Sequence, residues 1–304
     1  MRNERVNFYK YFPVSEDSTN WGIYIENIGK SEVLQNENYP LSGHPDTHFF
    51  TWDKGRYLSS YQMLIITDGQ GVFESESAGM ISLVPGSIIL LYPNEWHRYR
   101  PLKRTGWKEY WLGFNGSTVN NLVMGSQFET ARPVIAIRDF VEIQRLYDEA
   151  VIYSIEEGPG FQQIVVGILF QIFGHIHYSV KNRTRQSKSF LVHINNAKEI
   201  IQTRLKGEID VPQIASELNV GYALFRKKFK EFTGLSPKQY QTQVKLNRAK
   251  TLLLGSDLPV KSIAFETGFE SIYHFSKMFK EKTGYSPTEF REIVKESGKN
   301  GQNP

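Results

Sequence analysis

The sequence contains no cysteine and no long apolar run. Without thiols the chain can form neither disulfides nor thiolate metal sites. The first 25 residues carry Glu4, Lys10, Glu16 and Asp17 and therefore lack the apolar core of a signal peptide. The most apolar stretch, residues 164–173, is shorter than the roughly 20 residues that a membrane-spanning helix needs. We therefore expect a soluble, cytoplasmic protein.

Acidic residues are comparatively scarce toward the C-terminus. From Lys181 onward there are 22 Lys and Arg against 12 Asp and Glu, whereas the first 180 residues hold 14 basic and 20 acidic residues. A basic segment attracts a polyanion, while an acidic one does not. A length of 304 residues is typical of two domains.

The basic part contains the same pattern twice. The first copy comprises Ile214-Ala215, residues 225–230 and residues 233–239, and the second comprises Ile263-Ala264, residues 275–280 and residues 283–289. The offset is 49 at the Ile-Ala pair and 50 from Phe225 and Phe275 onward, so the second copy has one extra residue near Ser271. Such a period indicates two copies of one supersecondary unit.

Each copy contains Thr-Gly-x-Ser-Pro-x-Gln or Glu. Gly234 and Gly284 can adopt the left-handed conformation that closes a helix. Ser236 and Ser286 can then cap the next helix, with Pro at its first position and Gln or Glu completing a capping box. In the same way Asp210 can cap the helix that begins the first copy. The motif therefore ends one helix and starts another.

The closing helix of each copy has a buried stripe and a basic face. The stripes comprise Phe225, Phe229 and Phe232, and Ile272, Phe275 and Phe279. The opposite faces carry Ala223, Arg226, Lys227 and Lys230, and Tyr273, His274, Lys277 and Lys280. With the short helices expected at 211–218 and 260–267, each copy has the helix-turn-helix pattern, whose second helix enters the major groove. The alternative is a helical bundle whose basic faces are merely solvated.

We expect base-edge contacts from Ala223, Arg226, Tyr273, His274 and Lys277. The remaining lysines of the two faces, Lys227, Lys230 and Lys280, are expected nearer phosphates. A central helix at 237–254 would span roughly 27 Å, close to the roughly 34 Å between successive major-groove faces. Both recognition helices could therefore reach neighbouring turns of one duplex.

The N-terminal part has a β pattern from residue 24 to residue 114. Residues 61–67 predict a strand, Asp68-Gly69 a tight hairpin, and residues 71–73 the returning strand. Further strands are expected at 80–84, 88–92 and 97–100, separated by Pro-Gly and Pro-Asn turns. This spacing favours an antiparallel barrel or double-sheet jelly roll, which can hold a small ligand. Residues 1–30 are either a mobile arm or a frayed end followed by a first strand.

Residues 138–178 predict two helices. The first has an apolar stripe comprising Phe140, Ile143, Leu146, Tyr147, Ala150 and Val151. The second, 161–178, is apolar nearly all round and needs burial on two sides, against the barrel and a second subunit or wholly within the monomer. The predicted fold is α+β, with a β domain at 1–178, a linker at 179–188, and an all-α domain at 189–304 that ends in a disordered tail from 297.

A sugar would be held by aromatic faces and charged groups, and the β region supplies both. The candidates are Trp52, Trp96, Trp107, Trp111, Tyr99, Arg56 and Glu109. Alternatively, these aromatic side chains could simply pack in the core and at the rim of the barrel without binding a ligand. A metal-dependent cupin enzyme needs two or three His and a carboxylate in the barrel. His44 and His48 lack that spacing, His97 stands alone, and His175 and His177 do not share a helix face. We therefore expect no metal, no cofactor and no enzymatic activity.

Residues 189–295, with both helix-turn-helix copies in order, resemble the DNA-binding domain of the AraC/XylS transcription regulators. Residues 61–71, 85–97 and 107–114 resemble the cupin-type effector domain of the sugar-responsive members. The resemblance implies a sugar pocket lined by Arg56 (or Lys54), Tyr99, Glu109 and Trp111, although Glu109 departs from the family pattern. It also implies a homodimer that binds double-stranded DNA, a monosaccharide effector and contact with RNA polymerase. A second hypothesis is a regulator whose barrel only dimerises.

Overall fold

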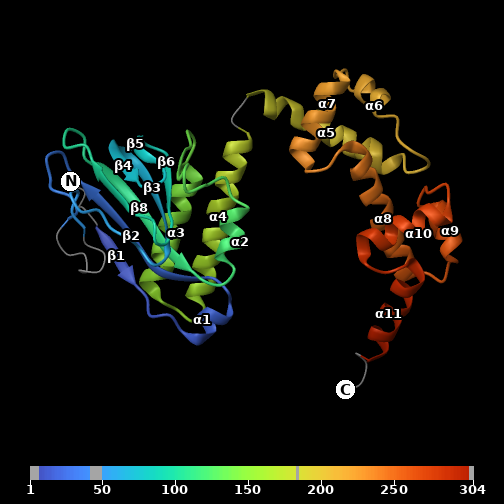
Figure 1. Cartoon of the computed structure of the whole chain (residues 1–304), viewed down its shortest axis with the longest axis horizontal. Helices are drawn as coiled ribbons and strands as arrows, with labels where there is room; N and C mark the ends of the chain where they lie inside the picture. Colours follow the sequence, from blue (N-terminus) through green and yellow to red (C-terminus); the bar gives the residue numbers. More distant parts are fainter. Residues whose placement is uncertain (1–6, 42–49, 183–184, 301–304) are drawn as a thin grey trace. The chain divides into compact units, whose positions relative to one another are not determined.

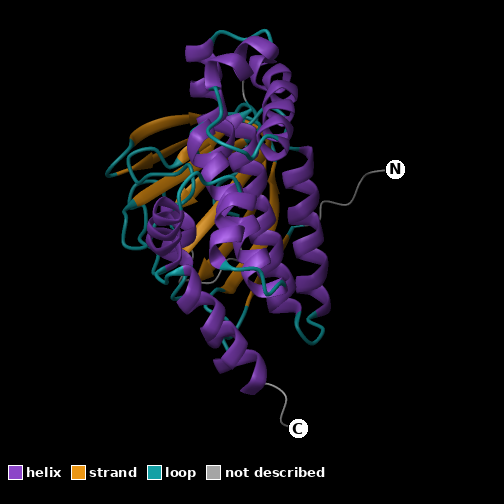
Figure 2. Cartoon of the chain, turned by 90° about the vertical axis from the view of Figure 1, so that its right-hand side faces the viewer, coloured by secondary structure: helices purple, strands orange, loops and turns teal. Residues whose placement is uncertain are grey.

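The computed structural model describes residues 7–41, 50–182 and 185–300, and the chain forms two compact units, 1–183 and 184–304. Every strand among the described residues belongs to the first unit; strands are orange and helices purple in Figure 2. The described part of the second unit consists of helices and their connections. The predicted α+β chain, β-rich first and helical second, is confirmed.

The first unit contains two antiparallel sheets. The larger has the order β1 (Phe8–Tyr11), β2 (Tyr24–Val33), β8 (Trp107–Asn115), β3 (Tyr61–Gly69), β6 (Ser87–Leu91) and β9 (Val134–Ala136). The smaller has the order β5 (Gly79–Leu83), β4 (Gly71–Ser75) and β7 (His97–Pro101). One apolar core lies between the sheets, and a second lies between the larger sheet and the helices. The short helices α1 (Glu16–Asn20) and α2 (Val119–Met124) were not predicted.

The hairpin predicted at Asp68-Gly69 is wrong. β3 pairs with β6 and β8, whereas β4 pairs with β5 and β7, so the chain passes from one sheet to the other at Gln70. Gly69 does have a positive φ of 77°, and a Cβ there would lie 2.1 Å from the carbonyl oxygen of Gly106. The turn signal predicted the change of direction, but strand pairing elsewhere in the sheets decided the partners.

Two helices cover the larger sheet: α3 (Val141–Glu156) and α4 (Phe161–Lys181), which lie side by side in Figure 1. The predicted stripe of α3 is buried, except that Phe140 precedes the helix and is only partly buried. Among the described helices, α4 alone has the length and hydropathy of a membrane span. Its residues Val165, Leu169 and Ile172 are nevertheless fully buried in the core with α3.

The N-terminal segment forms a strand in its described part. β1 pairs with β2, from Phe8 opposite Lys30 to Tyr11 opposite Asn27, and Phe12 is buried. Of the two expectations for this segment, the first strand is the one observed for residues 8–11. Residues 1–6 lie outside the described part.

Helices extend further than predicted. α4 continues to Lys181, α5 (Arg185–Thr203) begins within the expected linker, and α11 (Pro287–Asn300) includes the start of the tail that we predicted to be disordered. A glycine or serine lowers helix propensity by up to about 1 kcal/mol, but a helix that is already nucleated can extend through such residues. The boundaries at 178 and 189 remain predictions.

The second unit repeats a pair of helices around a connecting helix. The first pair is α6 (Val211–Glu217) and α7 (Tyr222–Thr233), the connector is α8 (Pro237–Gly255), and the second pair is α9 (Val260–Glu266) and α10 (Ile272–Thr283). Gly234 and Gly284 close α7 and α10 with φ of 76° and 82°. The predicted caps at Asp210, Ser236 and Ser286 all accept from the backbone N–H three residues on, and the capping boxes at Ser236 and Ser286 are complete.

The buried stripes of α7 and α10 are confirmed for four of their six residues, while Phe232 packs against the core but is only partly buried. Phe225, Phe229, Phe275 and Phe279 are fully buried. Ile272, however, is 40% exposed. It is the first residue of α10, and a helical side chain leans toward the N-terminus, so it extends beyond the core that the stripe covers.

Candidate functional site

The four predicted effector residues line one cavity in the core between the two sheets. Glu109 and Trp111 are two residues apart on β8 and therefore share a face. Tyr99 comes from β7, and Arg56 comes from a segment held to β7 by a backbone bridge to His97. The cavity measures about 20 Å³.

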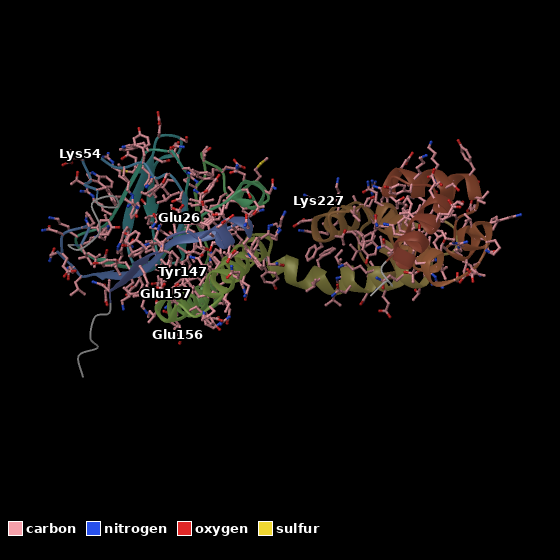
Figure 3. All side chains as sticks on the ribbon, turned by 90° about the horizontal axis from the view of Figure 1, so that it is seen from below. Glu26, Lys54, Tyr147, Glu156, Glu157 and Lys227 are labelled. Carbon is pink, nitrogen blue, oxygen red and sulfur yellow. The ribbon has the colours of Figure 1, made fainter. Side chains whose placement is uncertain are left out.

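Several side chains of the sequence prediction lie outside this cavity. Lys54, the alternative to Arg56, is exposed at the periphery of the first unit (Figure 3). The ring centre of Trp52 lies 4.3 Å from the guanidinium carbon of Arg98. The Trp96 indole N–H donates to the carbonyl oxygen of Lys54 at 2.9 Å. Arg56 is therefore the cation that reaches the cavity.

Among the described residues, three neutral side chains accept hydrogen bonds from Arg56. Its Nη2 donates to the hydroxyl of Tyr99 at 2.6 Å and to Oε1 of Gln62 at 3.3 Å, and its Nε donates to Nε2 of His97 at 3.3 Å. Because Nε2 of His97 accepts, its Nδ1 carries the proton and donates to the carbonyl oxygen of Glu95. Burial and the charge of Arg56 lower the pKa of His97 to about 3. The imidazole is therefore neutral and orients the guanidinium.

Among the described residues that line the cavity, Glu109 is the one carboxyl group, and it is only 3% exposed. It accepts hydrogen bonds from Ser31 at 2.9 Å and from Tyr39 at 3.2 Å. Burial raises the pKa of Glu109 to about 7, although both hydroxyls and the charge of Arg56 oppose this shift. Near neutral pH the group can accept a hydrogen bond when ionised or donate one when protonated.

Trp111 forms an apolar wall of the cavity. Its register partner on β2 is Gly29, where a Cβ would lie 2.2 Å from the indole ring. The glycine therefore leaves the space that the ring occupies.

Five further residues that were not predicted from the sequence line the cavity. They are Tyr11, Tyr39, Pro40, Phe50 and Gln62. Gln62 did have a signal, since it is a polar residue within the otherwise apolar run of β3. Tyr39 and Phe50 lie outside every strand, and no periodicity points to them.

A metal centre is not found among the described residues, where no three His, Asp or Glu side chains group closely enough to bind an ion. His44 and His48 lie outside the described part. His97 uses one ring nitrogen with Arg56 and the other with Glu95. His177 on α4 lies beside Gln127 at 3.3 Å.

The predicted DNA-binding residues are all exposed on α7 and α10. They are Ala223, Arg226, Lys227, Lys230, Tyr273, His274, Lys277 and Lys280. Figure 3 marks Lys227 in the second unit. The neighbouring Lys228 differs, since it pairs with Glu231 of its own helix at 3.0 Å. The two basic faces predicted from the repeat are therefore accessible to a polyanion.

Local contacts orient several of these side chains. The Arg226 guanidinium lies 5.4 Å from the ring centre of Tyr222, and its Nη1 donates to the Tyr222 hydroxyl at 3.4 Å. In the second copy the extra residue supplies a cap, because Ser271 accepts from the backbone N–H of His274. The ring of His274 lies edge-on to Phe269. Tyr222 was not predicted, although it stands one turn before Arg226.

Known protein families match both units. Residues 38–152 match the AraC-like ligand binding domain, and residues 214–293 match a helix-turn-helix domain. The chain is 26% identical to the lactose operon transcription activator of Staphylococcus xylosus, over 70% of this chain and 77% of that protein. It is 25% identical to the Msm operon regulatory protein of Streptococcus mutans, over 96% of this chain and 99% of that protein.

A third relative is the raffinose operon transcriptional regulatory protein RafR of Pediococcus pentosaceus, at 23% identity over 75% of this chain and 83% of that protein. Together the two domain matches cover more than half of the sequence, in the order ligand-binding domain and then helix-turn-helix. The exposed basic faces of α7 and α10 fit the second of these domains. The chain therefore belongs to the AraC family of DNA-binding transcription regulators.

Proposed function

We propose that a sugar bound in the cavity between the two sheets controls how this regulator binds DNA. One observation carries the proposal: a cation, a titratable carboxyl and an indole, from the segment before β3 and from β8, line the same cavity as Tyr99 of β7. The names of the lactose and raffinose operon relatives support a saccharide as the effector. Arg56, Tyr99, Glu109 and Trp111 are the residues that we assign to it.

The chemistry of the cavity suits a polyol. Arg56 can donate hydrogen bonds to sugar hydroxyl groups, and Glu109 can accept or donate one according to its protonation state. The indole ring of Trp111 can pack against the C–H groups of the sugar. A volume of about 20 Å³ holds little more than one water molecule, so a sugar can enter only if lining side chains move. Tyr11 of β1 is one of them. A ligand that binds the opened state more tightly shifts the population toward it, which couples the cavity to the N-terminal strand.

Thermal unfolding with a panel of pentoses, hexoses, their acids, lactose and raffinose tests this proposal. We expect at least one of them to raise the melting temperature, because a ligand that binds only the folded state stabilises it. Arg56→Ala should abolish that shift and the effector dependence of DNA binding while leaving basal DNA binding intact. Lys54→Ala, which removes a nearby cation that does not line the cavity, is the matched control and should keep both responses.

A second candidate function for the first unit is dimerisation alone, and exposed apolar side chains on α3 and α4 favour a subunit contact there. Ile152, Ile155, Ile164 and Phe170 are each between 43% and 56% exposed. We propose that these helices pair with their copies in a homodimer. Sedimentation should show a dimer at micromolar concentration. A dimer with no thermal response to any sugar would favour this candidate over the sugar-responsive regulator.

We also propose a division of the DNA contacts, in which some side chains of α7 and α10 contact bases and others contact phosphates. Ala223, Arg226, Tyr273, His274 and Lys277 would contact base edges. The phosphate contacts would come from Lys227, Lys230 and Lys280. We propose that the protein acts in the cytoplasm. We also propose that the DNA-bound dimer contacts RNA polymerase.

A further inference from the structure

The connecting helix α8 carries a buried lysine. Lys245 is 6% exposed, and its Nζ donates to the carbonyl oxygen of Gly207 at 2.6 Å and to that of Gly268 at 2.7 Å. Gly207 lies in the segment that leads into the first helix-turn-helix, and Gly268 lies in the turn of the second. One charged side chain therefore ties both motifs to the helix between them.

Gln241, one turn earlier on α8, adds to this junction. Its Nε2 donates to the carbonyl oxygen of Gly207 at 3.1 Å, and its Oε1 accepts from the backbone N–H of Ile209 at 3.4 Å. The second motif also touches the segment that leads into the first: Gly268 has φ of 84°, and a Cβ there would lie 1.9 Å from the carbonyl oxygen of Leu205. The turn of the second motif is thus packed against the backbone that enters the first.

Simple core stabilisation does not account for a lysine at this position. A buried charge is costly unless it is hydrogen bonded, and an apolar side chain of similar length would fill the space without that cost. Charge-assisted hydrogen bonds to fixed acceptors depend strongly on direction and distance. Lys245 therefore specifies one arrangement of Gly207 and Gly268, which an apolar side chain would not do.

We propose that Lys245, supported by Gln241, is a positioning residue for DNA recognition. It sets the separation and angle between α7 and α10, and so the number of base pairs between the two blocks of sequence that one chain reads. The length of α8 alone does not fix this angle. Loops join α8 to both motifs, and each motif could rotate about the axis of α8 if no other contact held it. The inference requires DNA binding only and is independent of the proposed sugar.

The test selects binding sites for the full-length chain from a pool of random DNA duplexes and sequences them. For the wild type we expect enriched blocks in pairs at one fixed spacing, one pair for each subunit that binds. Lys245→Met should enrich several adjacent spacings and bind the wild-type site about tenfold more weakly, as expected for the loss of a charge-assisted hydrogen bond. Lys250→Met removes the same charge from the same helix outside the junction, and should keep the single spacing.

Spacing is the informative readout, because a general loss of stability lowers the active fraction without changing the preferred spacing. If Lys245→Met retains the wild-type spacing and affinity, the proposal is overturned. If that variant fails to fold by circular dichroism, Gln241→Leu decides: broadened spacing supports the proposal and a single spacing overturns it. A wild-type selection with no enriched sequence would overturn it as well, together with the assigned base contacts.

Discussion

The two units position their functional residues in different ways. In the helical unit the candidate residues lie on α7 and α10, in chain order and about fifty positions apart. In the β unit the cavity residues Arg56, Tyr99, Glu109 and Trp111 come from separate segments that pair only in the folded sheets. A helix face is thus defined by local periodicity, whereas a pocket depends on which strands become neighbours.

Each unit also buries an ionisable side chain among its described residues, and the hydrogen-bond partners of the two differ. Glu109 has two hydroxyl donors and a pKa raised to about 7 by burial. Lys245 has two carbonyl acceptors from distant loops. A carboxyl that can lose its charge suits a site whose ligand comes and goes, while a lysine held by backbone suits a fixed junction.

The largest expected effect tests two points: whether the buried phenylalanines stabilise the helical unit, and whether the two units unfold independently. Phe225→Ala and Phe275→Ala should each cost about 3–5 kcal/mol, because both rings are fully buried. All five tryptophans belong to the first unit, so their fluorescence reports that unit alone in urea unfolding, while circular dichroism reports the helices of both units. Tyr273→Ala, at a site that is 77% exposed, should cost less than about 0.5 kcal/mol. A shifted tryptophan transition would show that the units do not unfold independently.

The next effect tests the buried carboxyl of the β unit. The pKa of Glu109 is raised from 4.5 to about 7 in the folded state, so the folded protein binds this proton more tightly than the unfolded chain does. The free energy of unfolding therefore decreases as the pH rises through about 7. The loss should be on the order of 3 kcal/mol between pH 5 and pH 9. Tryptophan fluorescence in urea at each pH measures it. Glu109→Gln cannot ionise and should flatten the dependence; an equally steep curve in that variant would assign it to another group.

A smaller effect separates base recognition from phosphate binding within the helical unit. Arg226→Ala should cost about 1–3 kcal/mol of binding and relax preference at one or two base pairs. Lys280→Ala should weaken all sequences alike and lower the salt slope by about 1. Fluorescence anisotropy on matched and scrambled duplexes at several salt concentrations measures both. Equal losses on every duplex for both variants would refute the division.

The smallest effect compares the two copies. Of the two equivalent helices α7 and α10, the second has a side-chain cap, Ser271, whereas Gly221 at the start of α7 provides none. Ser271→Ala should therefore lower the stability of the helical unit by about 1 kcal/mol. Ser262→Ala, at an exposed position within α9, is the control and should be neutral or slightly stabilising, since alanine has the higher helix propensity. Thermal unfolding followed by circular dichroism distinguishes the two.

Much of the helical unit was predictable because its signals are local. The caps at Ser236 and Gly284 and the stripe around Phe275 each involve residues within a few positions of one another. The β unit was less predictable. Strand positions followed from apolar runs and turns, but the predicted hairpin at Asp68-Gly69 was wrong, and Tyr39 carried no signal. The four cavity residues rested on a family resemblance, and their role in binding a sugar stays a prediction.

The sequence by itself therefore determined where helices start and stop, which of their faces are basic, and that the unit occurs twice, because capping and amphipathic periodicity act over one or two turns. Only the tertiary structure decided that β3 and β4 separate into different sheets, that Arg56 faces Glu109 across one cavity, and that Lys245 joins two motifs. These arrangements involve residues more than twenty positions apart. Their contacts form only when the chain closes into its sheets and helix pairs, and no local pattern encodes them.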